Sequence, residues 1–370
     1  MKWRSRRVSL GALVFLALFG IAVMATVELS KVRLRKPHFD EKVTASNLTM
    51  RAFSAVKNHA GETLVKDPIA DPNSTGLIGD QFTIITTDRG DLGAKLTTTN
   101  PNWGAVVVDM LSEAGARRED YVAVAYTGSM PALNIAVLCA IETIGATPVI
   151  ISSVGASMWG ANNPEFAWPD MESVLFENGI IKHRSTSASL GGRGDAGGNV
   201  SPEGRAKLRE IIERNGIDLI EAPTLDEAID RRMEIYGSAL PEGARYSAFV
   251  NVGGGLASIG SSQNLVAVRP GLNMTIPRGN FPRKGAMIRF AERGVPVINL
   301  SEVNEIARRY GLPVSPMPLP DVPHGDVYSE LRYRLWLTVL VLAIYLAMVF
   351  VVIRVDLTSV IFPRKGRNGE

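Results

Sequence analysis

The chain has 370 residues, of which 46% are hydrophobic and 21% are charged, and its 40 basic residues nearly balance its 37 acidic ones. This composition excludes a disordered chain and predicts a substantial hydrophobic core. The single cysteine, Cys139, excludes a disulfide framework or a cysteine-based metal site within one chain, and the four histidines have no metal-ligand spacing. We therefore expect no metal and no other cofactor.

Two apolar runs lie near the ends of the chain. Neither Val8–Val27 nor Leu335–Ile353 contains a charged residue, and each is long enough, as a helix, to cross about 30 Å of hydrocarbon. Both runs are therefore predicted to be transmembrane helices. A cleaved signal peptide is the alternative for the first run, but that run is longer than a typical signal core and ends without a small-x-small cleavage pattern.

The charges beside these runs predict the orientation in the membrane. The basic residues at the two ends are Lys2, Arg4, Arg6, Arg7, Arg354, Arg364, Lys365 and Arg367. Because basic segments stay in the cytoplasm, both tails are expected inside and the central domain outside. Four further basic residues follow the first apolar run and oppose this assignment: Lys31, Arg33, Arg35 and Lys36.

The predicted division of the chain follows from these runs. Cytoplasmic tails (1–7 and 354–370) and transmembrane helices (8–27 and 335–353) enclose a stalk and linker (28–80), an extracytoplasmic domain (81–312) and a proline-rich return linker (313–334). Within the stalk and linker, Phe39–His59 has helical periodicity, and we expect it to form the stalk itself.

The central domain alternates between two kinds of segment. Short β-branched runs are separated by segments with helical periodicity, and these predicted strands are 82–86, 121–126, 148–152, 217–221, 247–252 and 296–300. A capping box at Thr224–Glu227 and an N-cap at Ser201 before Pro202 mark two helix starts. The alternation predicts an α/β fold with a mostly parallel sheet and helices on both faces.

Ligands of such folds bind where strands end and helices begin. Thr127–Pro131 follows a predicted strand and opens an apolar helix, so Ser129 lies at a helix N-terminus, which attracts anions. Asn134 follows in the first turns of the same helix. Ser129 and Asn134 are therefore candidate ligand-binding residues, and the alternative is that Ser129 only caps the helix.

Two other junctions carry small residues. The glycines Gly253, Gly254 and Gly255 follow a strand and allow a backbone to approach a ligand closely, although they match neither the Rossmann fingerprint nor a phosphate loop. Ser152–Gly160 also follows a strand, and its small polar residues are consistent with a pocket wall or with a simple turn.

Catalytic residues are only weakly indicated. A nucleophilic serine needs a base, and His183 is the only histidine within the predicted α/β region. Two arrangements stay open. In the first, Ser129 forms a triad with His183 and either Asp170 or Asp195. In the second, Lys95 is the base for Ser129. Because the G-x-S-x-G elbow is absent, the sequence does not decide whether the protein is an enzyme.

A long acid-free window predicts a positively charged surface. Residues 243–291 contain no Asp or Glu, and the basic residues that we select from them are Arg269, Arg278, Arg283 and Lys284. Such a window favours an anionic ligand, although a buried strand and a Gly/Ser loop account for its first half. Nucleic acid is not expected, because aromatic stacking residues are not interleaved with these charges.

Three motifs carry a resemblance to a known family: Lys95–Trp103, Thr127–Asn134 and Ser152–Asn162. The chain resembles the poly-gamma-glutamate system protein family, accessory proteins of bacterial poly-gamma-glutamate synthesis. The resemblance implies a cell-envelope component that binds the anionic polymer during synthesis or export, with membrane subunits of the polymer synthase as partners. Two alternatives stay open, an extracytoplasmic serine-dependent hydrolase or transferase acting on the polymer's amide bonds, and a solute-sensing domain.

Overall fold

The computed structural model describes residues 10–61 and 67–354. The chain forms two compact units, one from Lys36 to Tyr328 and one built from the two ends of the chain. The predicted tail 1–7, and the predicted tail 354–370 apart from its first residue, lie outside the described residues.

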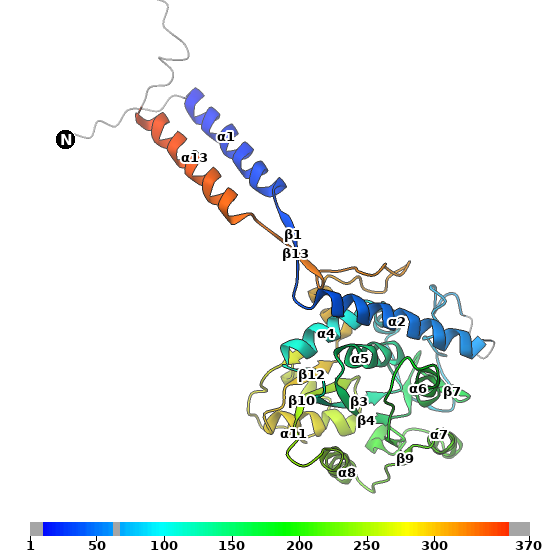
Figure 1. Cartoon of the computed structure of the whole chain (residues 1–370). Coiled ribbons are helices and arrows are strands. Elements are labelled where there is room, and N and C mark those ends of the chain that lie inside the picture. The colour runs from blue at the N-terminus through cyan, green and yellow to red at the C-terminus, as the bar shows by residue number, and fades with distance from the viewer. Residues whose placement is uncertain (1–9, 62–66, 355–370) are drawn as a thin grey trace, which may run out of the picture. The chain divides into compact units, whose positions relative to one another are not determined.

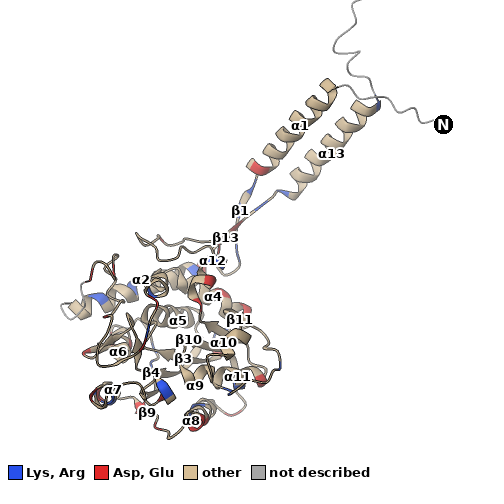
Figure 2. Ribbon diagram, turned by 180° about the vertical axis from the view of Figure 1, so that it is seen from behind, with Lys and Arg blue, Asp and Glu red and all other residues tan. Residues whose placement is uncertain are grey.

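The unit built from the two ends contains two long apolar helices. Helix α1 (Leu10–Leu29) lies beside α13 (Leu335–Arg354), and the rings of Phe19 and Tyr345 stack with centroids 6.2 Å apart (Figure 1). Strand β1 (Val32–Arg35) pairs in antiparallel fashion with β13 (Ser329–Arg332). Both helices are long and apolar enough to cross a membrane, and Figure 2 shows them free of charge along most of their length.

A seven-stranded sheet forms the centre of the larger unit. Its strands lie in the order β11 (Gly271–Asn273), β12 (Val297–Leu300), β10 (Tyr246–Val252), β3 (Tyr121–Thr127), β4 (Thr147–Ser153), β8 (Ser187–Ser189) and β9 (Asp218–Leu219). Only the edge strand β11 is antiparallel to its neighbour. The prediction of a mostly parallel sheet is confirmed.

Helices surround this sheet. They are α2 (Phe39–Ala60), α3 (Leu92–Thr98), α4 (Trp103–Glu113), α5 (Pro131–Ile144), α6 (Trp168–Glu177), α7 (Pro202–Arg214), α8 (Leu225–Ser238), α9 (Leu256–Ile259), α10 (Asn264–Ala267), α11 (Ala286–Glu292) and α12 (Val303–Arg309). Short elements complete the unit: a parallel pair of β2 (Thr86–Asp88) with β5 (Ala156–Ser157), an antiparallel pair of β6 (Asn162–Asn163) with β7 (Phe166–Ala167), and a 3₁₀ turn, η2 (Arg193–Asp195).

Side chains of β3 show why both faces of the sheet are covered. Successive side chains of a strand point to opposite faces. Val122 and Val124 join the hydrophobic cluster that contains α2, α4 and α5, whereas Ala123 and Ala125 join the cluster that contains α8 and α11. Because a parallel strand buried on both faces must be apolar throughout, the run Tyr121–Tyr126 is recognisable in the sequence.

The predicted strands match the observed ones only in part, and the edge strand β11 of the main sheet was not predicted. Five of the six overlap strands of the main sheet, but 82–86 is wrong: only Thr86 is in a strand, and β2 pairs with β5 outside the main sheet. Strand β8 was not predicted, because Ser187–Ser189 is small and polar rather than β-branched.

The segment expected to form a stalk is helical but belongs to the folded domain. Helix α2 buries Ala52, Phe53 and Val56 in the same cluster as α4 and α5. The expected return linker also docks on the domain, where the Asn102 side chain donates to the Asp321 carbonyl at 3.0 Å. Apolar residues on one face of α2 therefore serve the core of the domain, and a helix exposed on all sides would not bury them.

Candidate functional site

A cleft of about 580 Å³ opens at the carboxyl ends of the central strands. Its lining includes Thr127 at the end of β3, Ser153 at the end of β4 and Gly253 directly after β10. The chain runs from β3 to β4 on one side and later returns to β10 on the other side of β3. The cleft therefore lies at the topological switch point, where parallel sheets bind ligands.

Lys95 lies in this cleft with only 2% of its surface exposed. It is placed by α3, whose start is capped by the Asp91 side chain accepting from the Ala94 N–H at 3.1 Å. The Lys95 Nζ donates to the Ser129 carbonyl and lies 2.8 Å from the Ser157 Oγ. Among the described residues, no carboxylate lies within ion-pair distance of this amine.

The surroundings of Lys95 change its protonation. Burial removes the ammonium group from water and lowers the pKa of Lys95 to about 7, while the negative charge of Asp91 acts in the opposite direction. A substantial fraction of this lysine is therefore neutral at physiological pH, unlike a lysine in water.

Ser157 is the hydroxyl that the lysine reaches. It ends β5, is half-buried, and donates its backbone N–H to the Ser129 Oγ at 3.0 Å. Ser129 thus ties Ser157 to the turn between β3 and α5. It does not cap α5, because the N-cap position is Met130 and carries no side-chain cap bond.

The pairing of Lys95 with Ser157 was not predicted, since sequence reasoning considered Lys95 only as a base for Ser129. The signal that was available is the third strand-to-helix junction, Ser152–Gly160, which contains Ser157. Nothing in that segment distinguishes Ser157 from Ser152 or Ser153, so only the fold identifies the residue.

Two glycines are required by the close approach of neighbouring groups. Gly253 has a φ of 83°, and a Cβ there would lie 2.6 Å from the Thr127 Oγ1. A Cβ on Gly90 would lie 2.3 Å from the Met158 carbonyl oxygen and 3.3 Å from the Ser157 Oγ. Gly253, Gly254 and Gly255 all line the cleft, where the sequence placed a binding loop.

A buried polar network includes Ser153, the last residue of β4. Arg232 of α8 pairs with Asp195 of η2 at 2.9 Å and donates to the hydroxyls of Ser153 and Ser189 at 2.9 and 2.7 Å. Asp195 also accepts hydrogen bonds from both serines. This carboxylate is therefore fully engaged, and it is not available to orient a histidine.

The triad considered from the sequence is not assembled. Asp170 pairs with Arg214 at 2.6 Å and accepts from the Ala167 N–H. His183 follows α6 and is not among the residues that line the cleft. Asn134 is buried in α5, where its side chain donates to the Thr127 carbonyl at 2.9 Å and so holds the β3–α5 turn.

Basic residues of the acid-free window find acids elsewhere in the chain. Arg283 pairs with Asp226 at 2.8 Å and Lys284 pairs with Glu292 at 2.7 Å. Arg269 and Arg278 are exposed, and no ion pair is found for them within the described ranges. The residues selected from the window all lie outside the lining of the cleft.

The cleft has exposed cations of its own. Arg89 and Arg193 line it, and neither guanidinium has an acidic partner in the part of the chain that the structure describes. Asp88 and Asp91 share the same rim. The rim is therefore of mixed charge, with two arginines available to an anion.

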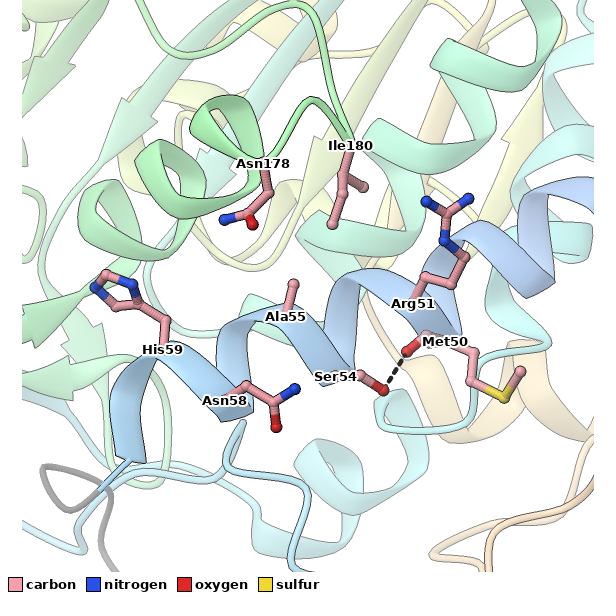
Figure 3. Close-up of a pocket in the computed structure, with 8 residues that line it drawn as sticks. All are labelled: Met50, Arg51, Ser54, Ala55, Asn58, His59, Asn178 and Ile180. Carbon is pink, nitrogen blue, oxygen red and sulfur yellow. Dashed lines mark hydrogen bonds between the residues drawn. The ribbon is translucent and has the colours of Figure 1, made fainter.

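A second hollow of about 660 Å³ runs along α2. Figure 3 shows Arg51, Asn58 and His59 beside it, with the Ser54 hydroxyl donating to the Met50 carbonyl at 3.0 Å. These polar side chains are exposed to solvent. The smaller cleft is the stronger candidate, because it combines a buried amine, a hydroxyl partner and glycine-lined backbone.

Comparisons of the chain with protein-family models, with curated proteins and with solved structures found no match.

Proposed function

We propose that this chain is a membrane-anchored envelope protein that binds poly-gamma-glutamate, an anionic polyamide, in the cleft at the carboxyl ends of β3, β4 and β10. The observation that supports this proposal is the presence of two exposed arginines without acidic partners, Arg89 and Arg193, beside a glycine-lined cleft. The polymer itself is suggested by the family resemblance of the three motifs around Lys95, Ser129 and Ser157.

The chemistry of the cleft suits such a polymer. Each repeat carries one free carboxylate, which a guanidinium binds through two parallel charge-assisted hydrogen bonds. Each repeat also carries an amide N–H, which the Asp88 carboxylate on the same rim can accept. A rim of mixed charge therefore fits a chain in which carboxylates alternate with amides.

Binding is assigned to the cleft rather than to the acid-free window for an electrostatic reason. Arg283, Lys284 and Arg289 are already neutralised by Asp226, Glu292 and Asp230. A polyanion binding at these three residues would have to displace their carboxylates, whereas Arg89 and Arg193 have none to displace. Arg269 and Arg278 are also unpaired among the described residues, but they lie outside the lining of the cleft.

Anchoring places the cleft at the envelope. In this proposal α1 and α13 cross the membrane, the basic tails remain in the cytoplasm and the domain is outside. The domain then receives polymer that membrane subunits of a synthase deliver at the outer surface.

Titration of the full chain in detergent with fluorescent poly-gamma-glutamate tests this assignment. Exposed charge contacts contribute about 0.2–1 kcal/mol each, so the variant with both Arg89→Gln and Arg193→Gln is expected to bind about tenfold more weakly. Its affinity should also depend less steeply on salt, because two screened contacts are gone.

A matched control removes two arginines that already have partners. The variant with both Arg283→Gln and Arg289→Gln loses the same charge but should bind nearly as well as the wild-type chain. The reverse pattern would move the binding site to the acid-free window, and a wild-type chain that fails to bind the polymer at any salt concentration would refute the proposal.

A further inference from the structure

A buried lysine without a carboxylate partner has a high energetic cost. Lysine is almost never fully buried unless it is paired, because its ammonium group loses its hydration. Lys95 is 2% exposed, and Asp91, whose charge acts on it, is not within ion-pair distance. Such a residue is usually retained for chemistry that requires a neutral amine.

The contacts of the amine fit its neutral form. A neutral amine has two N–H donors and one lone pair. One N–H is directed to the Ser129 carbonyl, which only accepts. The lone pair can then accept the hydroxyl proton of Ser157, whose Oγ lies 2.8 Å from the Nζ. This is the distance expected between a nucleophile and its base.

We propose that Ser157 and Lys95 form a catalytic serine–lysine dyad that transfers acyl groups from amide or ester substrates entering the cleft. Ser157 is the nucleophile and Lys95 is the general base. The site goes beyond polymer binding, since a binding protein needs neither a neutral lysine nor a hydroxyl within hydrogen-bond distance of it.

The reaction proceeds in two steps, acylation and deacylation of Ser157. Ser157 Oγ attacks the carbonyl carbon while Lys95 Nζ takes the hydroxyl proton, and Lys95 then gives this proton to the leaving amine or alcohol as its bond to the carbonyl carbon breaks. The acyl group is now an ester of Ser157. Water or a second amine attacks this ester, Lys95 takes the proton of the attacking group, and the proton returns to Ser157 Oγ as the ester bond breaks.

Neighbouring groups support these steps. The hydrogen bond from the Ser157 N–H to the Ser129 Oγ holds the nucleophile, and Gly90 leaves room beside it. Gly254 lines the cleft, and its N–H has no hydrogen-bond partner among the described residues, so it is free to donate to the substrate's carbonyl oxygen. Removal of one such donor commonly slows acyl transfer about 100-fold to 1000-fold.

The test uses the full chain in detergent with a fluorescent fluorophosphonate, which reacts with activated serines without needing the polymer. Peptide mapping is expected to find the adduct on Ser157. The labelling rate should rise with pH and level off above an apparent pKa of about 7, as Lys95 becomes neutral. The other charged groups that line the cleft are Asp88, Arg89, Asp91 and Arg193.

Variants separate a catalytic lysine from a structural one. Ser157→Ala should abolish labelling, and Lys95→Met should slow it about 100-fold or more. Ser261→Ala, which changes a serine outside the cleft lining, should label at the wild-type rate. Circular dichroism of each variant checks the fold, and the wild-type pH profile is informative even if Lys95→Met unfolds.

Three results would overturn the dyad: no adduct on the folded wild-type chain at pH 8, an adduct on Ser129 instead of Ser157, or a labelling rate that does not change with pH. The binding proposal is tested separately, by titration of the wild-type chain with the polymer. A wild-type chain that labels on Ser157 but does not bind poly-gamma-glutamate would retain the dyad and lose the proposed ligand.

Discussion

The guanidinium of Arg232 and the carboxylate of Asp195 form an ion pair of 2.9 Å in which the two side chains are only 2% and 1% exposed. Arg232 comes from α8 and Asp195 from η2, and both bond the hydroxyls of Ser153 and Ser189 at the ends of β4 and β8. Because Ser153 also lines the cleft, this network holds one wall of the candidate site.

Removal of one partner of this pair is expected to destabilise the domain strongly. Asp195→Ala leaves the Arg232 charge buried without a counter-ion, which typically costs about 3–5 kcal/mol. Urea unfolding of the full chain in detergent, followed by the fluorescence of its tryptophans, measures the change. Glu234→Ala is the matched control, because it breaks the exposed pair with Arg231 (3.0 Å) and should cost less than about 1 kcal/mol. Equal losses in the two variants would contradict this assignment.

Lys95→Met should change how stability depends on pH. The pKa of Lys95 is lowered from 10.5 to about 7 on folding, so the unfolded chain binds more protons between these values and wild-type stability rises with pH across that window. Below pH 7 both states are protonated, and the full cost of burying the ammonium group is present. The gain in the free energy of unfolding of the variant over the wild type should therefore be largest below pH 7 and should disappear toward pH 10. A difference that is constant with pH would contradict the lowered pKa.

Glu172→Gln should show the opposite dependence. Glu172 is buried and accepts from the Ser185 N–H at 2.9 Å, and burial raises its pKa from 4.5 to about 7. The folded chain binds more protons between these values, so wild-type stability falls as pH rises through the window. Glutamine keeps an acceptor for Ser185 and cannot ionise. We expect the variant to match the wild type near pH 4 and to be more stable by a few kcal/mol at pH 8, where each unit of pKa shift corresponds to about 1.4 kcal/mol. Thermal unfolding of both proteins at the two pH values measures this difference. A melting temperature that changes with pH by the same amount in both proteins would refute the prediction.

The orientation of the domain can be tested with a single introduced thiol. The one native cysteine, Cys139, is buried, and burial raises the pKa of its thiol to about 12, so it should not react. Ser238→Cys places a thiol on the exposed end of α8. A membrane-impermeant maleimide should label this variant in spheroplasts and leave the wild-type chain unlabelled. Labelling only after lysis would place the domain in the cytoplasm.

Local patterns were sufficient to predict much of the fold. The apolar runs that became α1 and α13 and the continuous apolar strands β3, β4 and β10 are recognisable because each depends on the character of consecutive residues. The cap at Thr224 was recognisable for the same reason, since its side chain bonds a residue three positions away. The sequence also indicated the three junctions that meet at the cleft.

Long-range contacts were decided only by the tertiary structure. The amine of Lys95 meets the hydroxyl of Ser157 because α3 and β5 fold against the same turn, and residues 62 positions apart have no pattern that links them. Two arginines of the acid-free window, Arg283 and Arg289, are neutralised by acids of α8, and Arg283 lies 57 positions from its partner Asp226. A run of basic residues therefore predicts a positively charged surface only when no acidic segment folds against it. In contrast, the residues of an apolar run are themselves sufficient to indicate that the run leaves water.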